Sequence, residues 1–257
     1  MPDDQERLRL RHRPDSPHVM YQRWRSLLFL HFPCDPAEIA RLLPPGLEVD
    51  TFPDASGEPK AWVGLVPFRM EGVRYRFLPA VPGLGAFPET NVRTYVHRKG
   101  KEPGVWFFSL DAANRLACEI ARRFFNLPYH EATMTVTEKN DRRRYASRRG
   151  SDGTAHEIEA EFGERLPDAE PGTLEFFLLE RYLLYAYREG SLFTGRVFHT
   201  PYPLRRAEAI SLGEGLVQAA GIESRPFVHA LASDGVDVMI YPLRRIAAPE
   251  DGTTETS

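Results

Sequence analysis

The sequence predicts a mixed, mainly β fold in which largely antiparallel strands form a barrel or a sandwich. Many apolar runs have strand length, whereas only two to four segments show helical spacing. No internal repeat or interdomain linker interrupts the pattern. The chain has 257 residues, 42% of them hydrophobic, which is enough for one sizeable core. We therefore expect one α+β domain with the helices at its flanks.

The first half of the chain is expected to hold six strands and two helices. Asp35 can cap a short helix that starts at Pro36 and ends before Pro44-Pro45-Gly46. A longer helix is predicted over 112–125, with Leu116, Ile120 and Phe124 on one face, Asp111 as its N-cap and Pro128 after it. The predicted strands cover 26–32, 47–52, 61–70, 73–78, 89–97 and 105–110, and the last two form a hairpin.

The second half continues with short strands. A hairpin is predicted around 150–153, with a basic arm over 142–149 and an acidic arm over 155–161. Opposite charges that face each other favour a solvated hairpin over a phosphate site. A helix is expected over 173–180 and a short one over 213–220. Further strands are predicted over 132–137, 182–188, 192–199, 204–210, 227–232 and 236–242.

Both ends of the chain read as disordered tails, over 1–19 and 247–257, around a single domain over 20–246. The first tail is charged throughout, so it is no secretory signal, and no apolar run is long enough to cross a membrane. A formal net charge of −3 argues against a nucleic-acid partner. Cys34 and Cys118 lie far apart and read as buried free thiols, which indicates a cytoplasmic protein.

The strand over 89–97 carries the best candidate site. Alternate residues of a strand share a face, so Glu89, Asn91, Arg93 and Tyr95 should point the same way while the apolar set packs. Buried polar groups are costly unless they are paired or used. Glu89 and Arg93 can therefore serve as acid/base and anion clamp, or they can form a buried ion pair that fixes the strand.

Other polar residues are weaker candidates. Ser109 ends the returning strand and lacks a GxSxG context. Arg181 either points a cation at the same cavity or is an exposed strand charge. The histidines are scattered without metal-ligand spacing, so no metal is expected. Among them, His31 reads as a satisfied core histidine and His199 as part of a proline-rich turn.

Several blocks together carry a family resemblance. They are WRSLLFLHF, LLPPGLEVDTF, AWVGLVPFRM, FPETNVRTYV, GVWFFSLDA, ARRFFNLPYHEA, LLERYLLYA and HTPYPLRRA. In this order they resemble the YqjF-like bacterial proteins, domain of unknown function 2071, over residues 20–243. That family resembles the acetoacetate decarboxylase-like fold. The resemblance implies an antiparallel β-barrel or cone-shaped sandwich with an internal pocket, assembled into a homo-oligomer.

In acetoacetate decarboxylase proper, a lysine in a turn after a helix forms a Schiff base, and a strand glutamate faces it. The resemblance places Tyr129 at the lysine position, with His130 beside it, and Glu89 at the glutamate. Neither Tyr nor His offers the primary amine that a Schiff base needs. The chain's lysines, Lys60, Lys99, Lys101 and Lys139, lie in polar turns or beside the basic hairpin. Schiff-base decarboxylation is therefore not expected.

Three functions stay open. The first is an enzyme of lyase or isomerase type that moves protons beside a carbonyl without a cofactor, through Glu89, Tyr129 and His130. The second is a protein that binds a small carboxylate without catalysis. The third is a structural or interaction protein with a vestigial pocket. In the first two, the residues expected to contact the ligand are Arg93, Asn91, Tyr95, Ser109 and Arg181.

Overall fold

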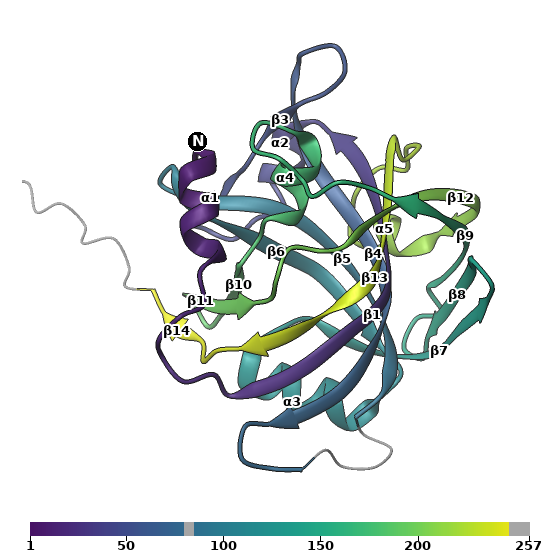
Figure 1. The fold of residues 1–257 in the computed structure, drawn as a ribbon. Helices are drawn as coiled ribbons and strands as arrows, with labels where there is room; N and C mark the ends of the chain where they lie inside the picture. The colour runs from purple at the N-terminus through teal and green to yellow at the C-terminus, as the bar shows by residue number, and fades with distance from the viewer. Residues whose placement is uncertain (80–84, 247–257) are drawn as a thin grey trace, which may run out of the picture.

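A computed structural model describes residues 1–79 and 85–246 (Figure 1). Its helices are α1 (Asp4–Arg11), α2 (Pro36–Ala40), α3 (Arg115–Phe125), α4 (Leu174–Leu179) and α5 (Gly215–Ala219). The strands of the first half are β1 (Met20–Cys34), β2 (Glu48–Val49), β3 (Phe52–Pro53), β4 (Pro59–Tyr75), β5 (Phe87–Arg98) and β6 (Lys101–Ala112). Those of the second half are β7 (Tyr129–Lys139), β8 (Arg142–Arg149), β9 (Ala155–Arg165), β10 (Leu183–Arg188), β11 (Ser191–Phe198), β12 (Leu204–Glu214), β13 (His229–Ile240) and β14 (Arg244–Arg245). The predicted mainly β fold is confirmed.

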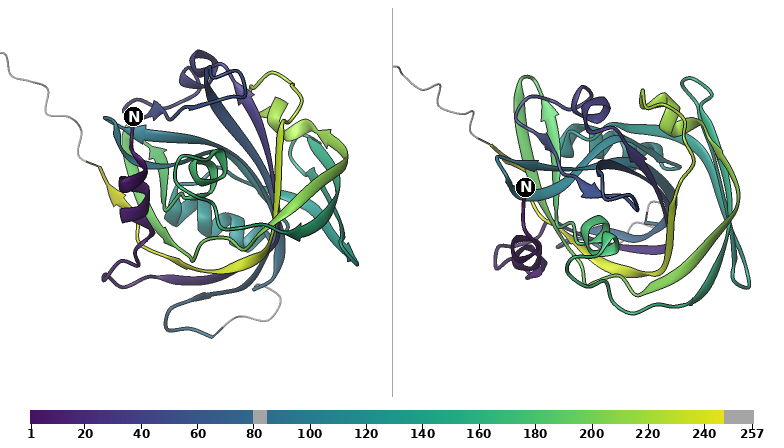
Figure 2. Two further views of the ribbon diagram at one scale, coloured as in Figure 1. Left: turned by 45° about the horizontal axis from the view of Figure 1, so that its top comes forward. Right: turned by 90° about the horizontal axis from the view of Figure 1, so that it is seen from above.

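The strands pair in two closed paths that share β13, β1, β4, β5 and β6. One path continues from β6 through β10 and β11 back to β13, and we call it the first ring. The other continues through β7, β8, β9 and β12, and we call it the second ring. Most pairs are antiparallel, but β6 runs parallel to both β7 and β10. Figure 2 shows the strands curving around the interior.

Each ring encloses its own apolar core, and the shared strands contribute to both. On β1, Leu27 and Phe29 belong to the core of the first ring, whereas Leu28 and Leu30 belong to that of the second. Successive residues of a strand point to opposite faces, so a strand between two cores must be apolar on both. This explains the uninterrupted apolar run of β1.

Several predicted strands were too short. The predicted strands over 61–70 and 73–78 join in the single strand β4, although 76–78 lie outside it. Those over 227–232 and 236–242 join in β13. The predicted 47–52 strand is instead two short strands, β2 and β3. The interrupting glycines, Gly72 and Gly235, have positive φ within the continuous strands, and sequence patterns read such residues as breaks.

The N-terminal segment was predicted to be a disordered tail, and the structure differs. Residues Asp4–Arg11 form helix α1, capped by the side chain of Asp3. Arg7 and Leu10 are buried, 3% and 5% exposed. Because α1 is polar by composition, only its tertiary contacts reveal that it packs against the sheet. The predicted tail over 247–257 lies outside the described residues.

The helices follow the capping prediction at α2 but not at α3. Asp35 accepts a hydrogen bond from the backbone N–H of Ala37, and Pro36 occupies the first turn of α2, as predicted. At α3 the N-cap is Asn114 and not Asp111, which lies in β6. Five helices stand in the described part of the chain, one more than expected. None of the described helices is long and apolar enough to cross a bilayer.

The charged hairpin forms as predicted. Strands β8 and β9 pair antiparallel, with Arg142 opposite Glu161 and Arg144 opposite Glu159. Arg142 lies 3.7 Å from the carboxylates of both Glu159 and Glu161. These side chains are exposed, so their pairing contributes little to stability. The basic arm is thus a solvated face balanced by the acidic one.

Candidate functional site

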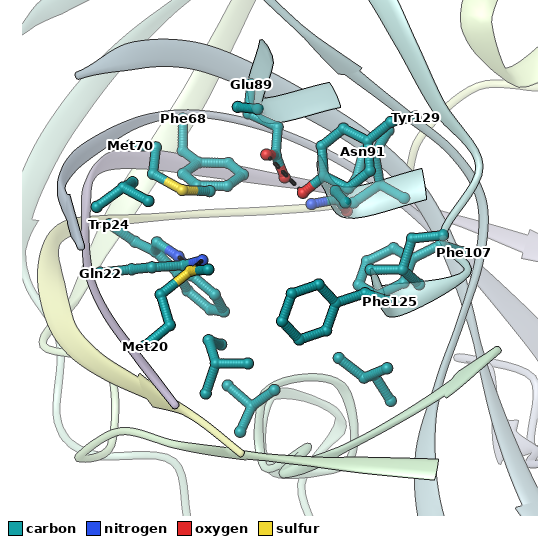
Figure 3. A pocket seen from close by; sticks show the side chains of 18 of the residues that line it. Met20, Gln22, Trp24, Phe68, Met70, Glu89, Asn91, Phe107, Phe125 and Tyr129 are labelled. Carbon is teal, nitrogen blue, oxygen red and sulfur yellow. Dashed lines mark hydrogen bonds between the residues drawn. The ribbon is translucent and has the colours of Figure 1, made fainter. Parts of the chain in front are cut away.

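A cavity of about 240 Å³ lies inside the first ring. Its long wall is the inner face of β5, which presents Phe87, Glu89, Asn91 and Arg93 in turn. The register places Phe87 opposite Met70 of β4, at one end, and Arg93 opposite Gly64, toward the other. Figure 3 shows the lining side chains around the open space. Of the residues that strand alternation predicts to share a face, Glu89, Asn91 and Arg93 line this cavity and Tyr95 does not.

Glu89 and Tyr129 form the acid/base pair of the cavity. The hydroxyl of Tyr129 donates a 3.0 Å hydrogen bond to Oε2 of Glu89 (Figure 3). Glu89 is 3% exposed, and burial raises its pKa to about 8, with the Tyr129 bond as a smaller opposing effect. Burial also raises the pKa of Tyr129 well above its ordinary value. Both groups therefore carry a proton at neutral pH.

Arg93 is a buried cation without a carboxylate partner in the described part of the chain. Its side chain lines the cavity and is 8% exposed as a residue, and its Nε atom has no hydrogen-bond partner there. Its guanidinium lies 5.8 Å from the ring centroid of Phe29 and 5.7 Å from that of Tyr95. The buried Glu89–Arg93 ion pair considered from the sequence does not form, because Glu89 bonds Tyr129 instead.

Arg181 lines the same cavity but is already partnered. It lies between α4 and β10, not on an exposed strand, and its guanidinium donates a 2.6 Å hydrogen bond to Asp50. Asp50 also accepts a 2.6 Å bond from Arg7 of α1. Burial lowers the pKa of Arg181 to about 10, while Asp50 opposes that shift. Its Nη2 atom has no hydrogen-bond partner among the described residues.

Tyr95 and Ser109 do not line the cavity. The hydroxyl of Tyr95 is 3.0 Å from Nε2 of His31, and its ring packs on Phe177. Ser109 pairs with Val92, whose side chain belongs to the core of the second ring. Directly paired residues point to the same face, so Ser109 faces away from the cavity. The ladder has an extra residue in β6, since Val92 pairs with Ser109 and Arg93 pairs with Phe107, and this shifts the alternation along β6.

His130 also lies on the other face of the sheet. The sequence suggested that Tyr129 and His130 share a turn, but both lie in β7, where neighbours point opposite ways. Tyr129 pairs with Leu110 of the cavity wall, and His130 pairs with Asp111. Asp111 receives hydrogen bonds of 2.8 to 2.9 Å from Arg149, so it is a buried ion-pair partner and not a helix cap. Tyr129 is therefore in the cavity and His130 is not.

The structure adds lining residues that sequence reasoning missed or ranked low. His199 is 2% exposed, and burial lowers its pKa to about 4, so its ring is neutral. Its Nδ1 donates to the carbonyl of Thr200 at 2.7 Å, which leaves Nε2 as an acceptor. From α3, Leu116 and Ile120 line the cavity as the helical spacing indicated, but Phe124 is 63% exposed. A histidine just before two prolines is hard to distinguish from a turn residue by sequence.

The lining holds no lysine, and none of the chain's four lysines reaches it. The tyrosine that stands at the expected lysine position therefore has no replacement amine nearby. Among the described residues, no group of three or more His, Cys, Asp or Glu side chains could hold a metal ion. Cys34 and Cys118 are buried free thiols, as predicted. The polar groups of the cavity are thus a carboxyl, phenols, carboxamides, guanidinium groups, an indole and a neutral imidazole.

Comparison with known proteins places the chain in a family. The profile of the domain of unknown function 2071 family, described as an uncharacterized conserved protein, matches residues 21–237. The uncharacterized protein YqjF of Bacillus subtilis (strain 168) is 40% identical over 241 residues, covering 90% of this chain and 94% of that protein. The chain belongs to the domain of unknown function 2071 family.

Solved structures share the fold at low sequence identity. Acetoacetate decarboxylase from Legionella pneumophila superposes with a TM-score of 0.63 at 14% identity, covering 96% of both chains. The enduracididine biosynthesis enzyme MppR, complexed with pyruvate, gives a TM-score of 0.62 at 13% identity, covering 90% of this chain and 91% of that one. An acetoacetate decarboxylase-like enzyme from Sphingomonas wittichii RW1 gives 0.63 at 12%, covering 90% and 94%. The chain thus has the acetoacetate decarboxylase-like fold.

Proposed function

We propose that the cavity binds a small carboxylate or carbonyl compound and moves protons beside its carbonyl group, as a lyase or isomerase does. The observation that carries the proposal is Arg93, a buried guanidinium on the cavity wall with no carboxylate partner among the described residues. A buried charge is costly unless it is paired. An anionic ligand would supply the missing partner, as the pyruvate of the MppR complex illustrates for a protein of the same fold.

The acid/base step falls to Glu89 and Tyr129. In its ionised form, which is the minority at neutral pH, Glu89 would take a proton from the carbon next to a carbonyl, and the C–H electron pair would become that of the enolate. The Tyr129 hydroxyl, which keeps its proton, would donate a hydrogen bond to the enolate oxygen. Returning the proton to a different carbon gives an isomerase, and expelling a leaving group gives a lyase. Asn91, between Glu89 and Arg93 on β5, can hold the carbonyl or the carboxylate.

One observation favours binding without catalysis. Since burial holds the pKa of Glu89 near 8, the carboxyl group is mostly protonated at neutral pH. In that form it donates a hydrogen bond but cannot accept a proton. A protein that only binds an acid would use Arg93 and a protonated Glu89 together.

The test of binding is thermal melting with a panel of carboxylic acids, including β-keto, hydroxy, enoic and aromatic acids. A ligand at 100 times its Kd should raise stability by about 2.7 kcal/mol in the wild type. Arg93→Met should lose that gain, yet its ligand-free form should be more stable by about 1–3 kcal/mol, because a buried unpaired charge is gone. Arg98→Met is the control, since Arg98 ends the same strand and bonds Glu102 outside the cavity. Equal gains in all three proteins would contradict the proposal.

The test of catalysis is deuterium exchange in heavy water. Any acid that binds and carries a carbonyl group should exchange the hydrogens beside that carbonyl, as followed by proton NMR. Glu89→Gln should bind such an acid but exchange it at least about a hundredfold more slowly. Binding without exchange in the wild type would assign the protein to the non-catalytic alternative.

A further inference from the structure

The cavity wall beyond Glu89 is mainly apolar, with Gln22 of β1 and Arg74 of β4 as its polar side chains. On the side of Glu89 away from Arg93, the register brings Phe87 opposite Met70, and Met70 opposite Trp24. All three side chains line the cavity, and Figure 3 shows Met70 and Trp24 there. Helix α3 covers this part with small and aliphatic side chains, namely Leu116, Ala117, Ile120 and Ala121. The polar groups of β5 and His199 therefore occupy one end of the cavity, and mostly apolar side chains line the other.

The exposure of the lining residues rises from the polar end of the cavity to its apolar end. At the polar end, Arg93 and His199 are 8% and 2% exposed. At the apolar end, the lining residues Tyr75, Leu78 and Leu116 are 37%, 58% and 45% exposed. These come from the end of β4, the segment after it, and α3, which lie at the same end of the sheet in Figure 1. The cavity therefore opens to solvent at its apolar end.

We propose that the ligand is an amphipathic monocarboxylate with an apolar tail. Its carboxylate would lie deep in the cavity at Arg93, and its tail would pass Glu89 and Tyr129 toward the opening. The inference rests on the proposed function for the carboxylate and adds the class of compound. An apolar cavity of about 150 Å³ holds one benzene. The 240 Å³ of this cavity therefore accommodates about ten non-hydrogen atoms, as in octanoate.

The position of the acid/base pair supports a ligand longer than a three- or four-carbon keto acid. Glu89 and Arg93 are four residues apart on one strand, which separates their Cα atoms by about 13 Å. A ligand that follows the strand from Arg93 to Glu89 thus spans several bonds between its carboxylate and the carbonyl beside Glu89. Met20 and Met70 contribute flexible thioethers to the tail region, and such side chains adapt to chains of varied shape.

The experiment is calorimetric titration with straight-chain acids from acetate to dodecanoate, beside the matching primary alcohols. Burying one methylene contributes about 0.8 kcal/mol, so affinity should rise about fourfold per carbon. The rise should continue to octanoate or decanoate and then stop, as the tail reaches the opening. Each alcohol should bind at least about tenfold more weakly than its acid, and binding should show a negative heat-capacity change.

The outcomes separate the two proposals. If affinity is independent of chain length but lost in Arg93→Met, the proposed tail site is wrong and the carboxylate site is supported. Acids and alcohols that gain equally with chain length, with Arg93→Met unaffected, would leave an apolar cavity and overturn the carboxylate site. No binding by any member of either series would overturn both.

A pair of variants in α3 tests where the apolar tail of the ligand lies. Ala121→Trp adds an indole to the face of α3 that lines the cavity, whereas Glu119→Trp adds the same group at an exposed position of that helix. Ala121→Trp should stop the rise in affinity several carbons earlier while leaving short acids unchanged. Glu119→Trp should behave as the wild type does. An unchanged chain-length profile in a folded Ala121→Trp protein would contradict a tail along α3.

Discussion

Glu89 combines a buried carboxyl group with a single hydrogen-bond partner, Tyr129, among the described residues. That environment favours the protonated form, because an ionised carboxylate would lose its hydration without gaining a cation. Arg93 lies on the same strand face but does not pair with it. The two groups are thereby left available to a ligand, at some cost in stability, as is usual for functional sites.

The stability of the protein should depend on pH through Glu89. Its pKa is about 8 in the folded state, against an ordinary value of about 4.5 when unfolded. Between these values the unfolded chain releases the proton that the folded chain keeps, so stability is lost as pH rises from about 5 to 8. Glu89→Gln should remove this loss, which is on the order of 3 to 5 kcal/mol.

Urea unfolding of both proteins at several values from pH 5 to pH 9 measures the difference. The free energy of unfolding of the wild type should fall relative to that of Glu89→Gln across this range. Parallel curves would show that Glu89 titrates normally in the folded protein.

One buried arginine of helix α1, Arg7, contacts the rest of the protein. Arg7 donates to Asp50 at 2.6 Å, and Arg181 donates to the same oxygen at 2.6 Å. Arg7 also lies 5.2 Å from the ring centroid of Phe177. Through Asp50, α1 is thus linked to a side chain that lines the cavity. A charged helix of eight residues would not be stable alone, so these contacts define it.

Arg7→Met should lower the free energy of unfolding by about 1–3 kcal/mol, because Asp50 loses one of its two cationic partners. Arg9→Met is the matched control, since the side chain of Arg9 is 66% exposed and its pair with Glu6 is on the surface. The control should change stability by less than about 0.5 kcal/mol. Urea unfolding measures both, and equal effects would mean that α1 does not depend on the Asp50 contact.

At the scale of the whole molecule, the first ring closes where β6 meets β10. The two strands run parallel there, with Leu184 opposite Val105 and Tyr185 opposite Trp106. Gly104 precedes this pair, and a Cβ atom at its position would lie 2.8 Å from the carbonyl oxygen of Leu183. The close approach of the two backbones therefore requires a residue without a side chain.

Gly104→Ala should destabilise the protein by about 1–3 kcal/mol or more, because the clash is with backbone atoms that cannot turn away. Gly150→Ala is the control, since a Cβ there would meet nothing closer than 4.0 Å. Thermal melting of the two variants checks the difference. A Gly104→Ala protein as stable as the control would show that the closure tolerates a wider spacing.

Much of the fold follows from local patterns. The apolar runs of β1 and β4, the hairpin of β5 and β6, the cap of α2 and the charge pairing of β8 and β9 all come from short-range rules. The candidate site follows in part, because strand alternation alone predicts that Glu89, Asn91 and Arg93 share a wall. The resemblance to acetoacetate decarboxylase-like proteins adds Tyr129.

Three features of the structure depend on tertiary contacts that local sequence rules do not describe. Whether His130 or Tyr129 enters the cavity depends on the parallel register of β7 against β6, which no short segment encodes. That α1 is folded depends on the contact of Arg7 with Asp50, which lies 43 residues after it. The partner of Glu89 likewise lies 40 residues away. The sequence by itself determined which strands are apolar and which polar groups one strand presents, because these depend on neighbouring residues. Pairing and burial arise from distant residues, so only the folded chain decides them.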